Sequence, residues 1–286
     1  MSCKIHPSSY VDSTAELGED VEIGPFAVVG PNVKIGDRSV LMPHCHIVTR
    51  TTIGSDTRIY TSAAIGGDPQ DMKYKGEDTD LIIGNNSRIG EFTTVNRGTG
   101  VGGGKTVIGD NALIMAYVHV AHDCIIGDNV IITNSTQLAG HVVIEDHAWI
   151  SGACLFHHFV TVGTMSFVAP ASGVRVDIPP YTIADGFKEN TRVRSLNLEG
   201  LRRKNVPNDS VEALKEAYRL LYRRNLTQLE AVAKVEEKGL AQDPYVKNLI
   251  EHIAASNAGF QSRALERYRT DKTRQFTTTR RIKEDE

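Results

Sequence analysis

The chain of 286 residues has little cysteine, little net charge and no long apolar run. Its net charge of −3 is too small to indicate binding to nucleic acid or to an anionic membrane surface. It has neither a signal peptide nor an apolar segment long enough to cross a bilayer, so we expect a cytoplasmic protein without stable membrane insertion. The four cysteines, Cys3, Cys45, Cys124 and Cys154, form neither a disulfide framework nor a metal-ligand pattern.

Isoleucine, leucine or valine recurs every six residues along two-thirds of the chain. The 26 positions of this repeat run from Ile5 to Ile65, from Ile83 to Val95 and from Ile108 to Val174, and Phe156 is the one non-aliphatic member. A period of six is neither that of an α-helix nor that of a simple strand. It therefore indicates a repeat architecture.

A small residue follows each of these positions by four, as Ala27 follows Ile23, and glycine often follows directly. Three of the cysteines occupy the small position, which indicates reduced packing groups. One large and one small inward side chain per hexad fill a narrow prism, with glycine at its tight corners. Three hexads make a coil of 18 residues whose strands stack about 4.8 Å apart. The pattern predicts a parallel β-helix of hexapeptide repeats, a β solenoid, over residues 1–178.

Two polar segments interrupt the repeat. Residues 67–81 contain the polar stretch DPQDMKYKGEDTD, and the repeat resumes in phase because Ile83 lies 18 residues after Ile65. Residues 97–107 contain a second, glycine-rich segment. Long loops on a regular solenoid usually carry function, so both segments are candidates for parts of a site.

A helical period replaces the hexads after Pro179 and Pro180. We expect a C-terminal α-helical domain over residues 179–260, with helices capped at Asp209 or Ser210, at Thr227 with Glu230, and at Asp243 before Pro244. Residues 261–286 hold eight basic and five acidic side chains with few apolar ones. This composition predicts a charged, disordered tail, and its mixed charge disfavours a nucleic-acid-binding arm.

Histidines gather at one edge of the predicted coils. His122, Gly140 and His158 are spaced by 18 and form one outward column, and Asp123 and His141 form the adjacent one. His119 and His157 lie beside them. A metal site is one possible use of such a cluster, but His119 and His122 are three apart, whereas zinc-binding carbonic anhydrases on this solenoid use a spacing of five. We therefore expect no metal.

General-base catalysis is the other use of this cluster. A histidine that titrates near neutrality can deprotonate a hydroxyl group, and an acidic neighbour can fix its tautomer. A backbone N–H of Gly140 can stabilise a developing oxyanion. This combination suits acyl transfer to an alcohol.

Seven segments in order resemble those of a known family. GDPQDMKY (67–74), NRGT (96–99), GGG (102–104), HVAHDC (119–124), LAGH (138–141), PPYTIADG (179–186) and NLEGLRRK (197–204) are similar to the acyl-carrier-protein-dependent UDP-N-acetylglucosamine O-acyltransferases. These enzymes catalyse the first step of lipid A synthesis. The resemblance implies a left-handed β-helix, a homotrimer with sites between subunits, no cofactor, and an acyl donor carried on the phosphopantetheine of acyl carrier protein.

The resemblance also implies roles for individual residues. His122 would be the general base, Asp123 would orient it, and Gly140 would supply the oxyanion N–H. The sugar would contact Asp71, Lys73, His119, His141, His157 and His158. The uridine and phosphates would contact Asn197, Glu199, Arg203 and Lys204, and Pro170 would lie where the acyl chain ends. His158, Lys204 and Pro170 depart from the residues common in the family, which are glutamine, arginine and glycine.

Two other functions remain open from the sequence. An N-acyltransferase of the same superfamily would acylate an amino-sugar nucleotide, but the later N-acyltransferase of the pathway carries an extra N-terminal domain for which a repeat beginning at Ile5 leaves no space. A non-catalytic solenoid that binds acyl carrier protein would not need His122, Gly140 and Asp71 together. The acyl length and the choice between a 3-hydroxyl and a 3-amino acceptor stay undetermined.

Overall fold

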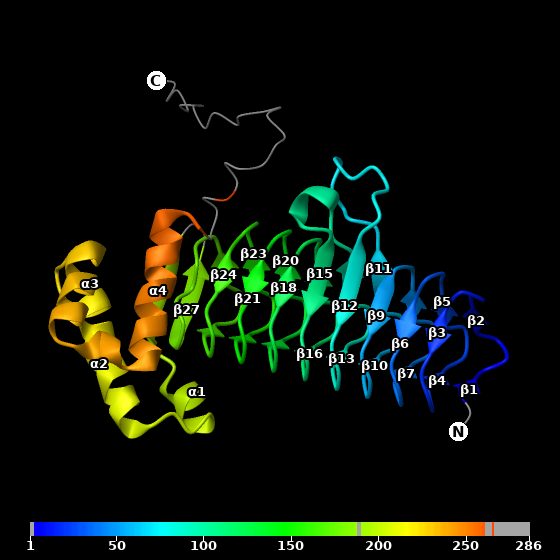
Figure 1. The fold of residues 1–286 in the computed structure, drawn as a ribbon, viewed down its shortest axis with the longest axis horizontal. Helices are drawn as coiled ribbons and strands as arrows, with labels where there is room; N and C mark the ends of the chain where they lie inside the picture. The colour runs from blue at the N-terminus through cyan, green and yellow to red at the C-terminus, as the bar shows by residue number, and fades with distance from the viewer. Residues whose placement is uncertain (1–2, 188–189, 261–264, 266–286) are drawn as a thin grey trace, which may run out of the picture.

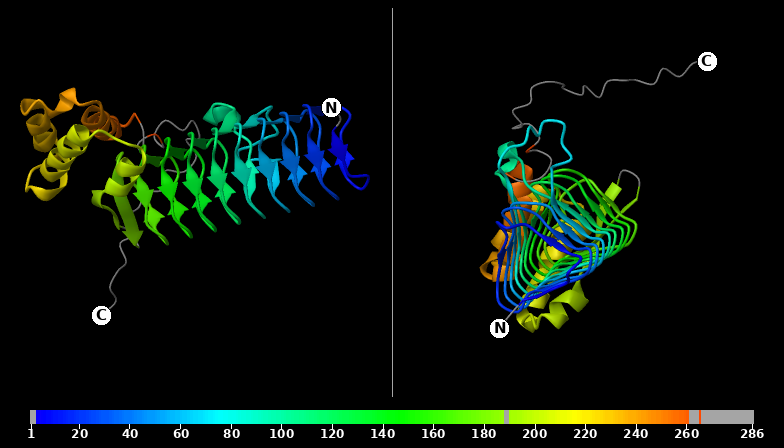
Figure 2. Two further views of the ribbon diagram at one scale, coloured as in Figure 1. Left: turned by 90° about the horizontal axis from the view of Figure 1, so that it is seen from below. Right: turned by 90° about the vertical axis from the view of Figure 1, so that its right-hand side faces the viewer.

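The computed structural model describes residues 3–187, 190–260 and 265. The hexads form a left-handed parallel β-helix of triangular cross-section, which is the predicted fold (Figures 1 and 2). Its strands are mostly two residues long, and each pairs in parallel with a strand of the next coil, as Ile5 pairs with Ile23. The predicted tail, residues 261–286, lies outside the described residues except for residue 265.

Three parallel sheets form the faces of the prism. Face A contains β1 (Lys4–Ile5), β4 (Glu22–Ile23), β7 (Val40–Leu41), β10 (Arg58–Ile59), β13 (Arg88–Ile89), β16 (Leu113–Ile114), β19 (Ile131–Ile132), β22 (Trp149–Ile150), β25 (Phe167–Val168), β27 (Thr182–Phe187) and β28 (Asn190–Leu196). Face B contains β2 (Tyr10–Val11), β5 (Val28–Val29), β8 (His46–Ile47), β11 (Ala64–Gly67), β14 (Thr94–Asn96), β17 (His119–Val120), β20 (Gln137–Leu138), β23 (Leu155–Phe156) and β26 (Gly173–Val174). Face C contains β3 (Glu16–Leu17), β6 (Lys34–Ile35), β9 (Thr51–Ile53), β12 (Asp80–Ile83), β15 (Lys105–Ile108), β18 (Ile125–Ile126), β21 (Val143–Ile144) and β24 (Thr161–Val162).

The interior of the prism is packed as the hexads predict. The aliphatic residue of each hexad and the small residue four later point inward, and from Val21 onward they are almost fully buried. Cys45, Cys124 and Cys154 are among the buried small residues, and burial raises the pKa of the Cys45 and Cys124 thiols to about 12. Such thiols are protonated at neutral pH and act as packing groups.

Glycine does not make the corners in the way that we expected from its conformational freedom. The left-handed φ falls three residues after each aliphatic residue, on non-glycine residues such as Phe26, Asn32 and His44. The glycine directly after the aliphatic residue is required for clearance instead. A β-carbon on Gly30 would lie 1.8 Å from the carbonyl oxygen of Val48 in the next coil.

The first loop changes which residues stack. The in-phase spacing predicted Ile83 over Ile65, but Ile65 pairs with Val95, and Ile83 pairs with Ile53. The chain leaves face B after β11 and rejoins the helix on face C, so the loop adds 12 residues to one coil. Both loops, residues 68–79 and 97–104, project from the same edge of the prism, between faces B and C (Figure 1).

A ladder of side-chain acceptors follows the edge between faces C and A. Each carboxylate or amide oxygen accepts the backbone N–H of the residue one coil earlier, and the ladder comprises Asp37, Asn85, Asp110, Asp128 and Asp146. These bonds satisfy turn N–H groups that the strand pairing leaves over. They tie neighbouring coils together at this edge.

The C-terminal part begins with a β-hairpin that the sequence analysis did not predict. β27 and β28 pair antiparallel and extend face A beyond β25. Helices α1 (Leu198–Arg203), α2 (Asn208–Arg223), α3 (Gln228–Glu237) and α4 (Pro244–Ala258) follow, with a short 3-10 turn η2 (Leu240–Gln242) before α4. They share a core that includes Leu214, Ala217, Val235 and Leu249.

Two of the three predicted helix caps are present. The Thr227–Glu230 capping box starts α3, and the Asp243 side chain accepts N–H groups at the start of α4. The cap predicted at Asp209 or Ser210 is wrong, because α2 starts earlier and Pro207 occupies its N-cap without a side-chain bond. Among the described residues, no helix has both the length and the hydropathy needed to cross a membrane.

Candidate active site

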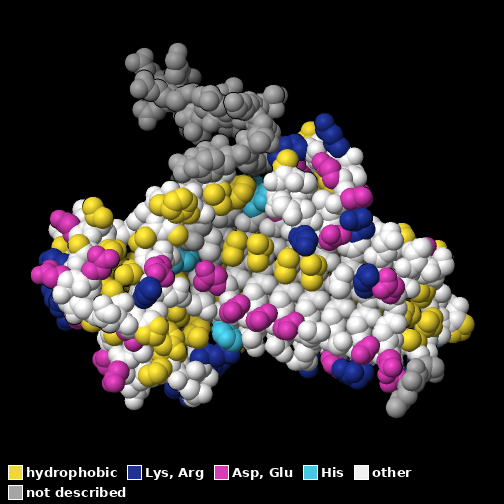
Figure 3. Space-filling model, viewed as in Figure 1, with side chains coloured by type: hydrophobic (Ala, Val, Ile, Leu, Met, Phe, Trp, Pro, Cys, Tyr) yellow, Lys and Arg dark blue, Asp and Glu magenta, His cyan; other side chains and the backbone are white. Residues whose placement is uncertain are grey.

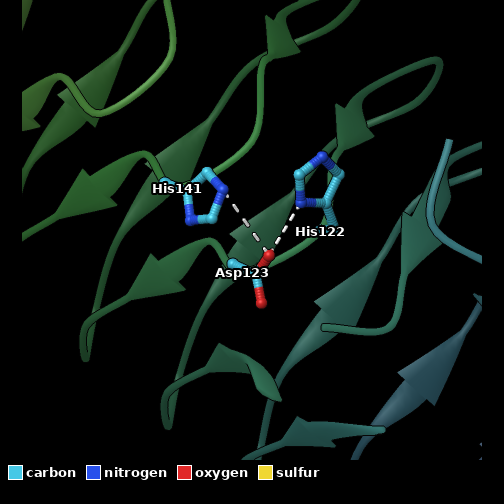
Figure 4. Close-up of side chains that lie close together, drawn as sticks. All are labelled: His122, Asp123 and His141. Atoms are coloured by element: carbon cyan, nitrogen blue, oxygen red, sulfur yellow. Dashed lines mark hydrogen bonds and ion pairs between the residues drawn. The ribbon is translucent and has the colours of Figure 1, made fainter. Parts of the chain in front are cut away.

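His122 and Asp123 occupy the turn between β17 and β18, at the edge where both loops project. Asp123 takes the left-handed φ of this turn position, +60°, which brings its side chain beside that of the preceding residue. His122 Nδ1 lies 2.7 Å from Asp123 Oδ2 (Figure 4). A carboxylate only accepts hydrogen bonds, so Nδ1 carries the hydrogen and Nε2 has a free lone pair.

His122 is more buried than an outward turn position suggested. The side chain points away from the interior of the prism, yet the residue is only 5% exposed because the loops cover it. Nε2 lies 4.0 Å from Asp71 Oδ2 of the first loop. A hydroxyl oxygen between these two atoms could hydrogen-bond to both.

Gly140 and His141 lie one coil beyond His122 and Asp123, as the spacing of 18 predicted. The His141 N–H donates to the His122 carbonyl, and His141 Nε2 lies 3.7 Å from Asp123 Oδ2 (Figure 4). In the described part of the chain, the Gly140 N–H donates to no protein acceptor. The ring of His141 stacks on Phe159 of the following coil, at 4.3 Å between centroids.

A groove of about 290 Å³ opens beside His122 on face B. Its walls include Gln70 of the first loop, Gly140, and the outward side chains of β17, β20 and β23, among them His119 and Leu155. His158 also lines it, whereas His157 lies next to His158 with their rings 5.5 Å apart. The groove therefore joins a buried base to an apolar surface.

His119 is held as a neutral hydrogen-bonding group. Burial and the adjacent charge of His122 lower its pKa. Its Nδ1 lies 2.7 Å from Thr94 Oγ1. A neutral imidazole in this position can bind a hydroxyl group of a ligand without adding charge to the site.

The first loop carries Asp71 and Lys73 to the edge of the groove. Asp71 accepts the Lys73 N–H, and its Oδ2 lies 3.2 Å from Lys73 Nζ. Burial opposes the ionisation of Asp71, but the hydrogen bonds and charge of Lys73 outweigh it and lower the pKa of Asp71. Asp71 is thus an anionic acceptor close to His122 Nε2.

Arg97 anchors this loop, and the sequence analysis missed it. The residue is 4% exposed and donates to the Gly66 carbonyl, to Asp68 and to the Tyr74 hydroxyl. A buried guanidinium with three acceptors fixes both ends of the segment that presents Asp71. The signal in the sequence was one arginine at the start of the second loop, too weak to single out.

The four predicted nucleotide-binding residues lie elsewhere. Asn197, Glu199, Arg203 and Lys204 line a second pocket of about 430 Å³ on face A, together with Trp149, Phe167 and His147. Within one chain they are not brought together with His122, which lies at the edge between faces B and C. Trp149 and Phe167 were also missed as pocket residues, although Ile131, Trp149 and Phe167 recur every 18 residues on the outward side of face A.

Hydrogen bonds organise the cationic side of this second pocket. Arg202 and Arg203 both donate to Glu199, and these bonds lower the pKa of Glu199 to about 2. The Arg203 guanidinium lies 5.9 Å from the centroid of the Trp149 ring. Burial and the charge of Lys204 lower the pKa of His147. The pocket combines an aromatic wall with cations, which suits a base and its phosphates.

Pro170 lies at a different edge from the histidines. It is an exposed residue of the turn between β25 and β26, where face A meets face B. His158 belongs to the turn between β23 and β24, where face B meets face C. A spacing of 12 is not a whole coil, so Pro170 borders the far side of face B instead of continuing the histidine column.

His122, Asp123 and His141 could also offer three ligand atoms to a cation, since these atoms lie within 4.8 Å of one another. Asp123 Oδ2 is already the acceptor of the His122 Nδ1–H bond. The arrangement is that of a hydrogen-bonded histidine–carboxylate pair.

A hexapeptide-repeat β-helix with a buried histidine–carboxylate pair beside an apolar groove defines the class of hexapeptide-repeat acyltransferases. Residues 105–140 match the family model described as bacterial transferase hexapeptide (six repeats). Residues 177–261 match the model of UDP-N-acetylglucosamine O-acyltransferase, domain 2.

Whole-chain comparisons are more specific. A protein of Paraburkholderia phymatum named acyl-[acyl-carrier-protein]–UDP-N-acetylglucosamine O-acyltransferase is 45% identical over 259 residues, which cover 90% of this chain and 98% of the relative. A protein of the same name from Sulfurovum is 45% identical over 255 residues, covering 89% and 96%. The chain belongs to the acyl-[acyl-carrier-protein]–UDP-N-acetylglucosamine O-acyltransferase family and is an acyltransferase.

Solved structures agree. UDP-N-acetylglucosamine acyltransferase from Campylobacter jejuni superposes with a TM-score of 0.82 at 40% identity, covering 88% of this chain and 96% of that one. The Francisella novicida enzyme of the same name superposes with a TM-score of 0.84 at 37% identity, covering 88% and 91%. The resemblance stated from the sequence segments is confirmed.

Proposed function

We propose that the chain transfers a 3-hydroxyacyl group from the phosphopantetheine thioester of acyl carrier protein to the 3-hydroxyl of UDP-N-acetylglucosamine, the first step of lipid A synthesis, with His122 as general base. The observation that carries this proposal is the 2.7 Å bond between His122 Nδ1 and Asp123 Oδ2, which leaves Nε2 unprotonated beside the groove. Membership of the family supports the substrates.

The reaction follows from this arrangement. His122 Nε2 takes the proton of the sugar hydroxyl as its oxygen attacks the thioester carbon, and Asp123 stabilises the imidazolium that forms. The Gly140 N–H, which has no protein acceptor in the described part of the chain, donates to the oxyanion. The intermediate then collapses, the carbon–sulfur bond breaks, and the imidazolium returns the proton to the phosphopantetheine thiolate.

Polar residues around the groove hold the sugar in this proposal. Asp71 accepts a hydrogen bond from the attacking sugar ring, and Lys73 donates one. His119, His141, His157 and His158 supply the remaining polar contacts on face B and its edge. The apolar part of the groove, near Leu155, receives the acyl chain, which gains about 0.8 kcal/mol for each CH₂ removed from water.

A homotrimer completes the site in this proposal. Asn197, Glu199, Arg203 and Lys204 line a pocket on another face of the prism, so one chain cannot present them and His122 to the same small molecule. A band of hydrophobic side chains crosses face C in Figure 3, where β12, β15, β18 and β21 direct Ile82, Val107, Ile125 and Val143 outward. Ile125 is 50% exposed in the single chain, which suits a surface that a second copy covers.

The test is acyl transfer by purified protein, with the product identified by mass spectrometry. His122→Ala should lower turnover by about 10²–10⁴-fold, the usual contribution of a general base, and should leave nucleotide binding intact. His44→Ala is the matched control, because His44 is an exposed turn residue on the opposite edge. Retention of more than half of the activity by His122→Ala would contradict the proposal, as would acyl transfer to a 3-amino acceptor alone.

A further inference from the structure

The carboxylate of Asp123 is bound by one residue of the second loop at both of its oxygens. The backbone N–H of Thr99 donates to Oδ1 at 2.8 Å, and the Thr99 hydroxyl donates to Oδ2 at 2.7 Å. Thr99 is 3% exposed and Asp123 is 5% exposed, so water does not compete for these bonds. Oδ2 is the same oxygen that accepts from His122 Nδ1.

The direction of the hydroxyl bond is fixed by its surroundings. The Gly102 N–H donates to Thr99 Oγ1 at 3.0 Å, which uses a lone pair of the hydroxyl group. The single hydroxyl hydrogen is then left for Asp123, which has only acceptors to offer in its ionised form. The turn η1 (Gly100–Gly102) therefore holds the hydroxyl oriented toward the carboxylate.

Gly102 closes the other side of the carboxylate. A β-carbon added there would lie 2.1–2.3 Å from all three atoms of the Asp123 carboxyl group. Gly100, in the same turn, has room for one, because the nearest atom would be Glu77 Cγ at 3.5 Å. The second loop is thus shaped around the carboxylate, and only Gly102 needs to lack a side chain for this purpose.

We propose that Thr99 is a positioning residue for the reaction: its hydroxyl holds the Asp123 carboxylate in the rotamer and charge state that keep His122 in the Nδ1–H tautomer. The proposal rests on His122 being the general base. Thr99 touches neither the groove nor His122, so it acts through Asp123 alone. The second loop then serves as support for the catalytic pair and not as a substrate clamp.

Kinetics of Thr99→Val and Thr99→Ser test this role. Valine keeps the shape and the backbone N–H but removes the hydroxyl, and we expect turnover to fall by about 10- to 100-fold, the value of a hydrogen bond to a charged group. The Michaelis constant for the sugar nucleotide should change less than twofold. Serine restores the donor and should recover at least half of the turnover.

Two further comparisons separate positioning from general loss of structure. Gly102→Ala should lower turnover as Thr99→Val does, whereas Gly100→Ala should be close to wild type. In an Asp123→Asn background, Thr99→Val should cost less than twofold, because its partner has already changed. Full turnover of Thr99→Val, or the same loss in both backgrounds, would overturn the proposal. Its failure alongside an inactive His122→Ala leaves the general base in place, whereas an active His122→Ala removes the base itself.

Discussion

Gly140 lies one coil beyond His122, and a β-carbon added to it would come within 2.5 Å of Cε1 of the His122 ring. The ring cannot turn aside freely, because Nδ1 is bound to Asp123. The absence of a side chain at Gly140 is therefore a condition for the position of His122. The backbone N–H that we assign to the oxyanion belongs to the same residue.

Gly140→Ala should therefore displace the imidazole and lower turnover. A misplacement of about 1 Å in a reacting group can cost about 10²-fold in rate, and we expect a loss of that order. Steady-state kinetics and a thermal unfolding curve measure the two effects separately. An alanine variant with wild-type turnover would show that the ring has room to move, and Gly100→Ala serves as the control.

Arg203→Ala and Lys204→Ala should weaken binding of the sugar nucleotide more than they slow its conversion. Removing a charge-assisted contact to a phosphate should raise the Michaelis constant at least about tenfold with a smaller change in turnover. Arg202→Ala is the matched control, because Arg202 also pairs with Glu199 but does not line the pocket. Equal loss of turnover in all three variants, without a binding defect, would instead indicate a structural role for α1.

Pro170→Gly should shift the preferred acyl chain to greater length. The proline ring adds carbons at the edge of face B where glycine has none, and one clashing methylene gives roughly 10- to 200-fold discrimination. Activity against acyl-carrier-protein thioesters of graded length measures the shift. An unchanged length profile would mean that Pro170 only stiffens its turn and that the acyl chain ends before reaching this edge.

Val130→Asp should prevent folding of the solenoid. Val130 is fully buried inside the prism, and an unpaired charge there costs several kcal/mol. Val101→Asp makes the same change at a site that is 71% exposed and should leave thermal stability nearly unchanged. Soluble expression and the unfolding midpoint compare the two variants, and a normally melting Val130→Asp protein would contradict the packing described for the core.

The sequence by itself determined the solenoid, because the inward side chains of a narrow prism must repeat with the coil. A spacing of 18 was sufficient to place Gly140 beside His122 and His141 beside Asp123, since strand pairing turns this spacing into contact. The capping box at Thr227 and the cap at Asp243 were also predictable, because each depends on residues within one turn of helix. Local rules and a strict period need no knowledge of the rest of the fold.

Only the tertiary structure decided what the loops do. The stacking of Ile83 on Ile53 depends on where the first loop rejoins the helix, which a period cannot reveal. The burial of His122, the anchoring of Asp71 by Arg97 and the hold of Thr99 on Asp123 are contacts between irregular segments with no repeat to predict them. The separation of Arg203 from His122 likewise follows from the prism, whose three faces place residues by their position around a coil and not by their distance along the chain.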